Sequence, residues 1–352
     1  MHNHNKENLL NLSLEEIKAV VKSFDEKPFR AKQIFKWLYK GASNFEDMTD
    51  IPKALKEKLS ARYYIGGVKI IKKLTSQYDD TRKYLFLLPD RNIIEGVIMK
   101  YHYGYTMCLS TQVGCRMGCR FCESTRQGLI RNLEPGEMLA QVLQANKDLG
   151  PANKRWIRNI VLMGSGEPLD NYDNTIKFLK LLHDSEGWNM SYRNMTLSTC
   201  GLVPGIRKLA EENIPLTLSI SLHAPNDNIR KMLMPVASAY GVSEIIDAAK
   251  EYFEKTGRRV TFEYSLVQGI NDSLENAAEL AERLKGFPCH VNVIPINEIE
   301  GGDFTRSDEE QICKFIDTLK ARGLQVTRRR ELGQDIQGAC GQLKRGYLDS
   351  LH

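Results

Sequence analysis

Residues 157–163, Ile-Arg-Asn-Ile-Val-Leu-Met, form a short apolar run that predicts a buried β-strand. A helical pattern precedes this run at Pro135–Leu149, and another follows it at Asn174–His183. Parallel strands need a crossover connection between them, which is usually a helix. A strand between two helices is therefore the unit of a parallel sheet, and the fold depends on whether this unit recurs.

The same unit recurs from about residue 100 to residue 329. Further strands are predicted at Tyr105–Gln112, Asn194–Ser198, Leu216–Leu222, Val260–Leu266, His290–Ile296 and Leu324–Arg329, and further helices at Val242–Lys255 and Ser307–Arg322. Six or seven such units indicate an α/β fold with a parallel sheet. A closed barrel of eight units needs about 250 residues. This region has that length but fewer units, so we expect a partly open barrel of the (β/α)6 type.

The first ninety or so residues have a different pattern. Ser13 and Glu16 form a capping-box motif before the apolar-periodic run Leu14–Phe24. Two more helices are predicted near Pro28 and at Pro52–Tyr63, and strands at Val68–Leu74 and Arg82–Leu88. We expect a small helical accessory domain at residues 1–95, a barrel at 96–335 and a C-terminal segment at 336–352.

The composition is that of a globular protein. Of the 352 residues, 42% are hydrophobic and 26% are charged, which argues against disorder and against a coiled coil. No apolar run approaches the roughly 18 residues of a membrane span, and Met1–Asn11 lacks the apolar core of a signal peptide. We therefore expect a cytoplasmic protein with no membrane partner. The net charge of +5 allows a local basic face but does not demonstrate nucleic-acid binding.

We do not expect the eight cysteines to form a disulfide framework in a cytoplasmic chain, and three of them fall in one short loop. Residues 114–122, Gly-Cys-Arg-Met-Gly-Cys-Arg-Phe-Cys, place Cys115, Cys119 and Cys122 at the spacing C-x-x-x-C-x-x-C. Such a loop can hold a 4Fe-4S cluster through three thiolates and leave one iron open for a substrate. The alternative is a structural zinc site, but zinc wants four ligands and no fourth Cys or His follows at a zinc-finger spacing.

With Phe121 before its last cysteine, the loop resembles the signature of the radical S-adenosylmethionine (SAM) enzymes. The resemblance extends to the RlmN-type dual-specificity RNA adenine methylases, through residues 106–115 (TMCLSTQVGC), 128–133 (GLIRNL), 163–171 (MGSGEPLDN), 197–201 (LSTCG), 219–226 (SISLHAPN) and 335–343 (DIQGACGQL). The accessory helices resemble that family's N-terminal domain. The chain departs from the family at Ser165, where many members carry Met, and at Gln337-Gly338, and neither position supplies an essential group.

This resemblance implies a radical SAM barrel that uses a 4Fe-4S cluster and SAM, with an accessory domain for RNA recognition. It implies methylation of carbon 2 of adenosine 2503 in 23S rRNA and, in some members, of adenosine 37 in tRNA. Carbon 2 lies between two ring nitrogens and is electron-poor, so it is not a nucleophile and methylation there needs radical chemistry. An electron donor such as flavodoxin or ferredoxin is implied, and we expect a monomer.

Residues at the ends of the predicted strands are candidates for SAM binding. Gly166 and Glu167 follow an apolar strand, where a carboxylate can accept hydrogen bonds from an ammonium group. Polar or capping residues also follow the later strands, and each of them alone is more often structural. The resemblance assigns SAM binding to Gly166, Glu167, Ser198, Ser221, Leu222, His223 and Asn297.

Two further thiols and one carboxylate complete the predicted site. Cys340 has small neighbours that leave its thiol accessible, although a lone cysteine is more often buried and inert. The resemblance implies that Cys340 carries the methyl group as S-methylcysteine in a ping-pong reaction with two SAM molecules. It also implies that Cys108 is the second catalytic thiol, which forms a transient disulfide with Cys340, and that Glu95 accepts a proton. Cys200, Cys289 and Cys313 receive no role.

Alternatives remain open at this level. A Cfr-type enzyme shares the thiols and the cluster but methylates carbon 8, and no physical argument from these motifs separates the two positions. An RNA-binding protein with a purely structural cluster and a radical SAM enzyme for a small molecule or peptide are the other classes, and both leave the paired thiols without a purpose. For RNA contacts, the basic-aromatic stretch Phe29–Lys40 either packs its aromatics inward or binds RNA, and the further candidates are Arg126, Arg131, Arg328–Arg330 and Lys344-Arg345.

Overall fold

The computed structural model describes residues 6–151, 154–298, 301–339 and 341–342. Within them, a ten-stranded sheet in the order β14-β13-β12-β11-β10-β9-β6-β5-β4-β3 forms the centre of the fold. The parallel strands are β6 (Gly104–Cys108), β9 (Ile157–Leu162), β10 (Met195–Thr199), β11 (Thr217–Ser221), β12 (Thr261–Leu266), β13 (His290–Pro295) and β14 (Gln325–Arg328). The predicted α/β fold with a partly open parallel barrel is confirmed.

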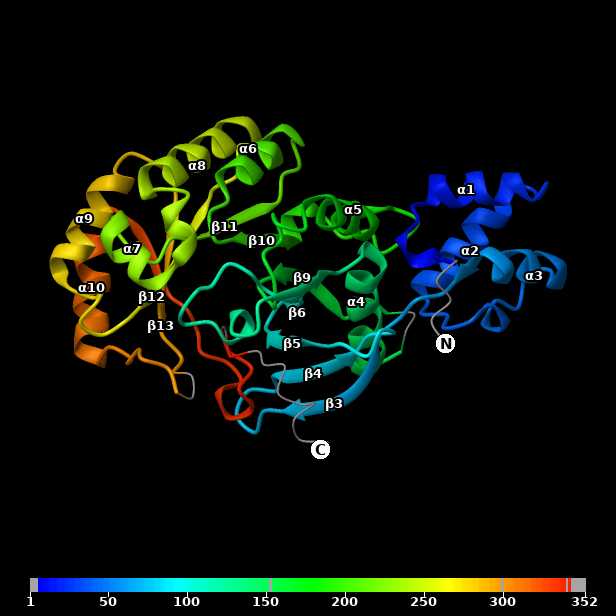
Figure 1. The fold of residues 1–352 in the computed structure, drawn as a ribbon, viewed down its shortest axis with the longest axis horizontal. Coiled ribbons are helices and arrows are strands. Elements are labelled where there is room, and N and C mark those ends of the chain that lie inside the picture. The colour runs from blue at the N-terminus through cyan, green and yellow to red at the C-terminus, as the bar shows by residue number, and fades with distance from the viewer. Residues whose placement is uncertain (1–5, 152–153, 299–300, 340, 343–352) are drawn as a thin grey trace.

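Helices connect these strands and cover the outside of the curved sheet (Figure 1). They are α4 (Pro135–Leu149), α5 (Tyr172–His183), α6 (Val203–Glu211), α7 (Asp227–Leu233), α8 (Val242–Thr256), α9 (Leu274–Leu284) and α10 (Glu309–Ala321). In β12, Phe262 and Tyr264 are buried beneath the helices, whereas Glu263 and Ser265 line a cavity inside the barrel. This alternation follows from the two-residue period of a strand.

The predicted strand Tyr105–Gln112 is two strands in the structure. After β6 the chain leaves the barrel sheet, because the Thr111 N–H donates to Ser165 O (2.9 Å). It then pairs as β7 (Gln112–Gly114) with β8 (Leu129–Asn132) in a separate antiparallel hairpin. The cysteine loop lies between these two strands, so the hairpin brings its ends together.

Three antiparallel strands, β3 (Lys69–Thr75), β4 (Arg82–Leu87) and β5 (Ile93–Tyr101), extend the barrel sheet beyond β6. The predicted domain boundary at residue 95 falls inside β5. Hydrogen bonding of the sheet is therefore continuous from the barrel into the second half of the region expected to be accessory.

The accessory helices α1 (Leu14–Ser23), α2 (Phe29–Tyr39) and α3 (Lys53–Arg62) lie beside α4 and α5, at the end of the molecule opposite α9 and α10 (Figure 1). The capping box of Ser13 and Glu16 is present at the start of α1. Helix α2 buries Phe35, whereas Phe29 at its start is 49% exposed, so the predicted inward packing of the aromatics holds for only part of the stretch. Tyr39 Oη donates to Leu181 O (2.7 Å) and ties α2 to α5.

Candidate active site

The cysteine loop is closed at its base by one backbone contact. The Cys115 N–H donates to Gly128 O (3.1 Å), and Thr125 Oγ1 donates to the carbonyls of Cys119 (3.0 Å) and Cys122 (2.9 Å). Gly114 has a φ of +76°, and a Cβ there would lie 2.0 Å from Gly128 O. Only glycine lets the two ends of the loop approach this closely.

All three loop cysteines line a cavity of about 160 Å³ at the carboxyl ends of the barrel strands. We call it the cluster cavity. The predicted SAM-binding residues that also line it are Gly166, Glu167, Ser198, Ser221, His223 and Asn297. Leu222 does not line it, because its side chain is fully buried and its backbone N–H donates to Glu263 O (3.1 Å). The structure thus gathers these residues from the ends of four strands, β9, β10, β11 and β13, around the cysteines.

The donor set of this cavity fits an iron–sulfur cluster. Burial raises the pKa of the Cys115 thiol to about 12. The pKa of Cys119 lies well above its ordinary value, mainly because the thiol is buried and to a smaller extent because the Cys122 and Cys115 thiols lie nearby. Iron would stabilise the thiolates that burial disfavours. Within the described residues no three Cys, His, Asp or Glu side chains are gathered closely enough for a single metal ion. A polynuclear cluster holds its thiolates further apart than one ion does.

Glu167 is the acidic group of the cluster cavity. Its carboxylate accepts hydrogen bonds from the Leu169 N–H (3.0 Å) and the Cys200 N–H (2.7 Å) and is only 3% exposed. Burial raises its pKa, while these two hydrogen bonds lower it. A buried carboxylate on the wall of a cavity suits the ammonium group of an amino-acid ligand.

The glycines before Glu167 line the cluster cavity and also allow close packing of the chain behind it. A Cβ on Gly166, whose φ is +113°, would lie 2.6 Å from Thr111 Oγ1 and 2.7 Å from the Gln112 backbone nitrogen. A Cβ on Gly164 would lie 2.6 Å from the carbonyl of Leu109. These glycines therefore let the β9 loop contact the segment that leads to the cysteines.

His223 has a defined tautomer and an unusual backbone. Its φ is +57°, a backbone angle that residues other than glycine rarely adopt. Burial, and then the charge on Arg230, lower its pKa to about 3, so the imidazole is neutral near pH 7. The Ser265 N–H donates to Nδ1 (2.9 Å), which places the ring proton on Nε2. The Phe121 ring meets the imidazole edge to face at 5.0 Å.

Sequence reasoning missed Glu263 in the cluster cavity. Its Oε1 accepts from Ser219 Oγ (2.6 Å) and Asn292 Nδ2 (3.2 Å). Its Oε2 is buried with no hydrogen-bond partner among the described residues and lies 3.7 Å from Arg329 Nη1. A buried acceptor of this kind calls for a ligand donor such as a hydroxyl or amino group. The cavity thus fits SAM, and the polar alternation within β12 is the signal that could have revealed this residue.

Arg230 was also missed, and it ties the ligand-binding strand ends together. Its guanidinium is fully buried and donates to the carbonyls of Leu222 (3.2 Å) and Cys200 (2.5 Å). Burial lowers its pKa, while the nearby Cys200 and Cys119 raise it. No carboxylate among the described residues lies within ion-pair distance of it. From the sequence, Arg230 is one arginine in a helical pattern, and nothing in that pattern predicts that it binds the carbonyls of Leu222 and Cys200.

A second cavity, of about 40 Å³, adjoins the first and is lined by Cys108. We call it the Cys108 cavity. The residues that line both cavities are Met163, Ile294, Asn297 and Arg329. Cys340 lies outside the described residues, but its neighbour Ala339 lines the Cys108 cavity and Gly341 lines the cluster cavity. Gly341 O also accepts from the Glu123 N–H (2.8 Å), directly after Cys122.

Glu95 lies near Cys108 but lines neither cavity. It forms a buried ion pair with Lys83 (3.0 Å), and Lys83 Nζ donates to Gln337 O (3.2 Å) in the C-terminal segment. Val97 pairs directly with Cys108 across β5 and β6, and Glu95 is two residues before Val97. All three side chains therefore point to the same face of the sheet.

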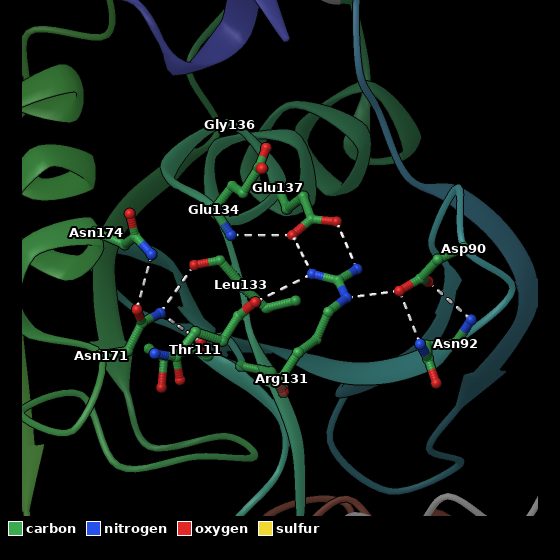
Figure 2. A network of polar contacts seen from close by, with 12 residues as sticks. Asp90, Asn92, Thr111, Arg131, Leu133, Glu134, Gly136, Glu137, Asn171 and Asn174 are labelled. Atoms are coloured by element: carbon green, nitrogen blue, oxygen red, sulfur yellow. Dashed lines mark hydrogen bonds and ion pairs between the residues drawn. The ribbon is translucent and has the colours of Figure 1, made fainter. Parts of the chain in front are cut away.

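Most of the predicted phosphate contacts have carboxylate partners in the structure. Arg131 lies between Glu137 (2.8 Å) and Asp90 (2.5 Å), as Figure 2 shows, so the structure assigns it to an internal network instead. Arg126 pairs with Glu123 (3.2 Å) and Arg328 with Glu309 (2.5 Å). Lys344 and Arg345 lie outside the described residues.

Comparisons with known proteins identify the family. Residues 7–65 match the model of the ribosomal RNA large subunit methyltransferase N-terminal domain, and residues 109–281 match that of the radical SAM superfamily. A relative from Alkaliphilus oremlandii, named "Probable dual-specificity RNA methyltransferase RlmN", is 53% identical over 98% of this chain and 99% of its own. One of the same name from Clostridium perfringens strain SM101 is 55% identical over 97% and 98%.

The chain belongs to the RlmN family of dual-specificity RNA methyltransferases. The crystal structure of a radical SAM methyltransferase from Sphaerobacter thermophilus agrees, with a TM-score of 0.92, 42% identity and coverage of 96% of this chain and 99% of that one. As an RlmN-family protein, the chain is a radical SAM enzyme that methylates RNA and uses a 4Fe-4S cluster and SAM.

Two remaining expectations can be compared with the structure. No described helix is long and apolar enough to cross a lipid bilayer. None of the described cysteines forms a disulfide, Cys108 included. The predicted transient disulfide has its other half at Cys340, outside the described residues.

Proposed function

We propose that this enzyme methylates carbon 2 of adenosine 2503 in 23S rRNA and of adenosine 37 in tRNA, with Cys340 as the methyl carrier. The observation that supports this most is the adjacency of the two cavities. One is lined by the cluster cysteines and the other by Cys108. Of the two neighbours of Cys340 in the chain, Gly341 lines the first cavity and Ala339 the second.

Cys115, Cys119 and Cys122 are the residues that would hold the cluster. When bound, the reduced cluster and SAM supply the radical that activates the methyl group on sulfur. Glu167 would bind the ammonium group of SAM, and Glu263 would accept from a hydroxyl or amino group through its buried Oε2. Ser198, Ser221, His223 and Asn297 lie at the strand ends around the same volume.

Cys340 and Cys108 have different roles in the transfer of the methyl group. Cys340 attacks the methyl carbon of the first SAM, and the sulfonium leaves as a neutral thioether. Once the carrier's carbon is joined to the base, Glu95, with the aid of Cys108, takes up the proton of carbon 2, and the one remaining electron returns to the cluster. The Cys108 thiolate then attacks the sulfur of Cys340, so a disulfide forms. The base leaves with the electron pair of the broken C–S bond and gains a proton on its new carbon, which becomes the methyl group.

Product analysis tests this proposal. The chain is reconstituted with iron and sulfide without oxygen, reduced with dithionite, and given SAM and an unmodified rRNA fragment. Mass spectrometry against both standards should find 2-methyladenosine. Cys340→Ala should abolish it, whereas Cys313→Ala, at an exposed cysteine of α10, should not.

Other products identify the alternatives. 8-Methyladenosine would assign the Cfr-type reaction, and an unmethylated RNA with no SAM cleavage would indicate a structural cluster. A Cys340→Ala variant that still methylates would defeat the carrier scheme. The domain division, the monomeric state, the flavodoxin or ferredoxin donor and the cytoplasmic location stay predictions.

A further inference from the structure

A stacked tyrosine pair occupies the tip of the β5–β6 hairpin, where no function has been assigned. The rings of Tyr101 and Tyr103 lie 5.1 Å apart at an angle of 7°, and the His102 ring meets Tyr103 edge to face at 5.0 Å. Tyr103 is 49% exposed. An exposed aromatic face held in place by a second ring is a surface on which a nucleobase can stack.

A third cavity, of about 270 Å³, lies against this hairpin. We call it the tyrosine cavity. It is lined by both tyrosines and by Arg193 and Arg329, and no Asp or Glu is among its lining residues in the described part of the chain. The Thr106 hydroxyl also lines it and is buried without a hydrogen-bond partner among the described residues. The cavity therefore combines aromatic faces, positive charge and an unused polar group.

Of the two arginines in this cavity, Arg329 lies 3.7 Å from the Glu263 carboxylate, so the charge offered to a ligand is mainly that of Arg193. No described carboxylate lies within ion-pair distance of Arg193, whereas Arg131 and Arg328 both have carboxylate partners. Phosphate is the anion that RNA offers at every nucleotide.

The tyrosine cavity continues into the proposed reaction site. It shares Met99, Tyr101 and Arg329 with the Cys108 cavity, and Arg329 also lines the cluster cavity. A chain of neighbouring cavities thus runs from the exposed hairpin past Cys108 to the loop cysteines. A base in the Cys108 cavity would have its neighbouring nucleotide beside the hairpin.

We propose that the tyrosine cavity binds the substrate RNA nucleotide next to the target adenosine. Its base stacks on Tyr103, and its phosphate contacts Arg193 and Arg329. Asn159, which also lines the cavity, offers an amide to the edge of the base. This inference rests on the proposed function, because it takes the Cys108 cavity as the place of the target base.

The test compares Tyr103→Ala with Tyr103→Phe in the cluster-loaded enzyme, using a fluorescein-labelled rRNA hairpin with an unpaired adenosine. Loss of one stacked base weakens RNA binding by about tenfold, so Tyr103→Ala should raise Kd by that factor and Tyr103→Phe should not. Arg193→Gln should lower the slope of log Kd against log salt by about 0.7. A second RNA, abasic at the nucleotide beside the target, should bind equally to the unaltered chain and to Tyr103→Ala.

A reaction without RNA separates this inference from the proposed function. SAM-dependent methylation of Cys340, followed by protein mass, should be the same in Tyr103→Ala and the unaltered chain. Equal RNA affinity of the two chains would overturn the inference even if 2-methyladenosine is formed. Equal losses in Tyr103→Ala and Tyr103→Phe, or a loss of Cys340 methylation in Tyr103→Ala, would overturn it as well. If the unaltered chain methylates no RNA, the proposed function fails instead.

Discussion

Lys83 Nζ lies 3.0 Å from Glu95 Oε2, and only 5% and 6% of the two side chains are exposed. The pair joins β4 to β5 on the face of the sheet that carries Cys108. Lys83 also donates to Gln337 O, three residues before Cys340. One buried ammonium group thus connects the proposed proton acceptor to the segment that carries the methyl-accepting thiol.

Lys83→Met should destabilise the protein strongly. The variant leaves the Glu95 carboxylate buried without its cation, which costs roughly 3–5 kcal/mol. Urea unfolding should show a lower midpoint. The double variant Lys83→Met/Glu95→Gln should recover part of the loss, because no unpaired charge remains. A single variant as stable as the unaltered chain would contradict this role of the pair.

Replacing Arg230 should weaken SAM binding while the cysteines still load iron. Lys at this position keeps the charge but cannot reach the carbonyls of both Leu222 and Cys200, and each lost hydrogen bond to a charged group costs about 1.5–3 kcal/mol. Isothermal titration should show a SAM affinity lower by about tenfold or more for Arg230→Lys. Iron and sulfide analysis provides the control. Unchanged SAM affinity would show that the strand ends keep their places without this tie.

Two glycine variants distinguish a steric clash from backbone strain alone. Gly166→Ala places a Cβ 2.6 Å from Thr111 Oγ1, whereas Gly257→Ala, at the end of α8, meets nothing within 4 Å. Both have positive φ, so both pay about 1 kcal/mol for backbone conformation. Only Gly166→Ala should also lose SAM binding, measured by titration. Equal behaviour of the two variants would refute the close packing of the β9 loop.

The stabilisation from Asp148 should depend on pH. Burial raises the pKa of Asp148. Hydrogen bonds from Lys73 and Tyr84, and the charges of Lys73 and Arg82, have a larger effect in the opposite direction, so the pKa lies below its ordinary value of 3.8. A carboxyl with a lowered pKa stabilises the fold fully above its unfolded value and loses this effect as pH falls below it.

At pH 7, Asp148→Asn should therefore lower the free energy of unfolding by about 1 kcal/mol, seen as a lower urea midpoint. The difference in stability between this variant and the unaltered chain should shrink towards pH 3. Asp247→Asn on α8, where the ion pair with Lys250 is exposed, is the control with the same change in charge. A difference that stays constant with pH would exclude the charge of Asp148 as its cause.

The local signals were sufficient for the elements and the cofactor. Helix α4 has the predicted bounds Pro135–Leu149, and the barrel strands lie within a few residues of their predicted places. The cysteine spacing and the motifs after each strand identified the family, because a cluster loop and a strand end are continuous in sequence. The strand break between β6 and β7 was missed, since the contact that causes it comes from Ser165, far along the chain.

Sequence alone determined the α/β order, the three clustered cysteines and the residue types at the strand ends. These depend on periodicity and spacing within short segments. Only the tertiary structure decided that Glu263 faces the cluster cavity, that Arg230 joins two strand ends, and that Arg131 is held by Asp90 and Glu137 (Figure 2). The physical reason is that burial and pairing of a charge depend on strand register and on which distant segment packs against it, and no local pattern contains that information.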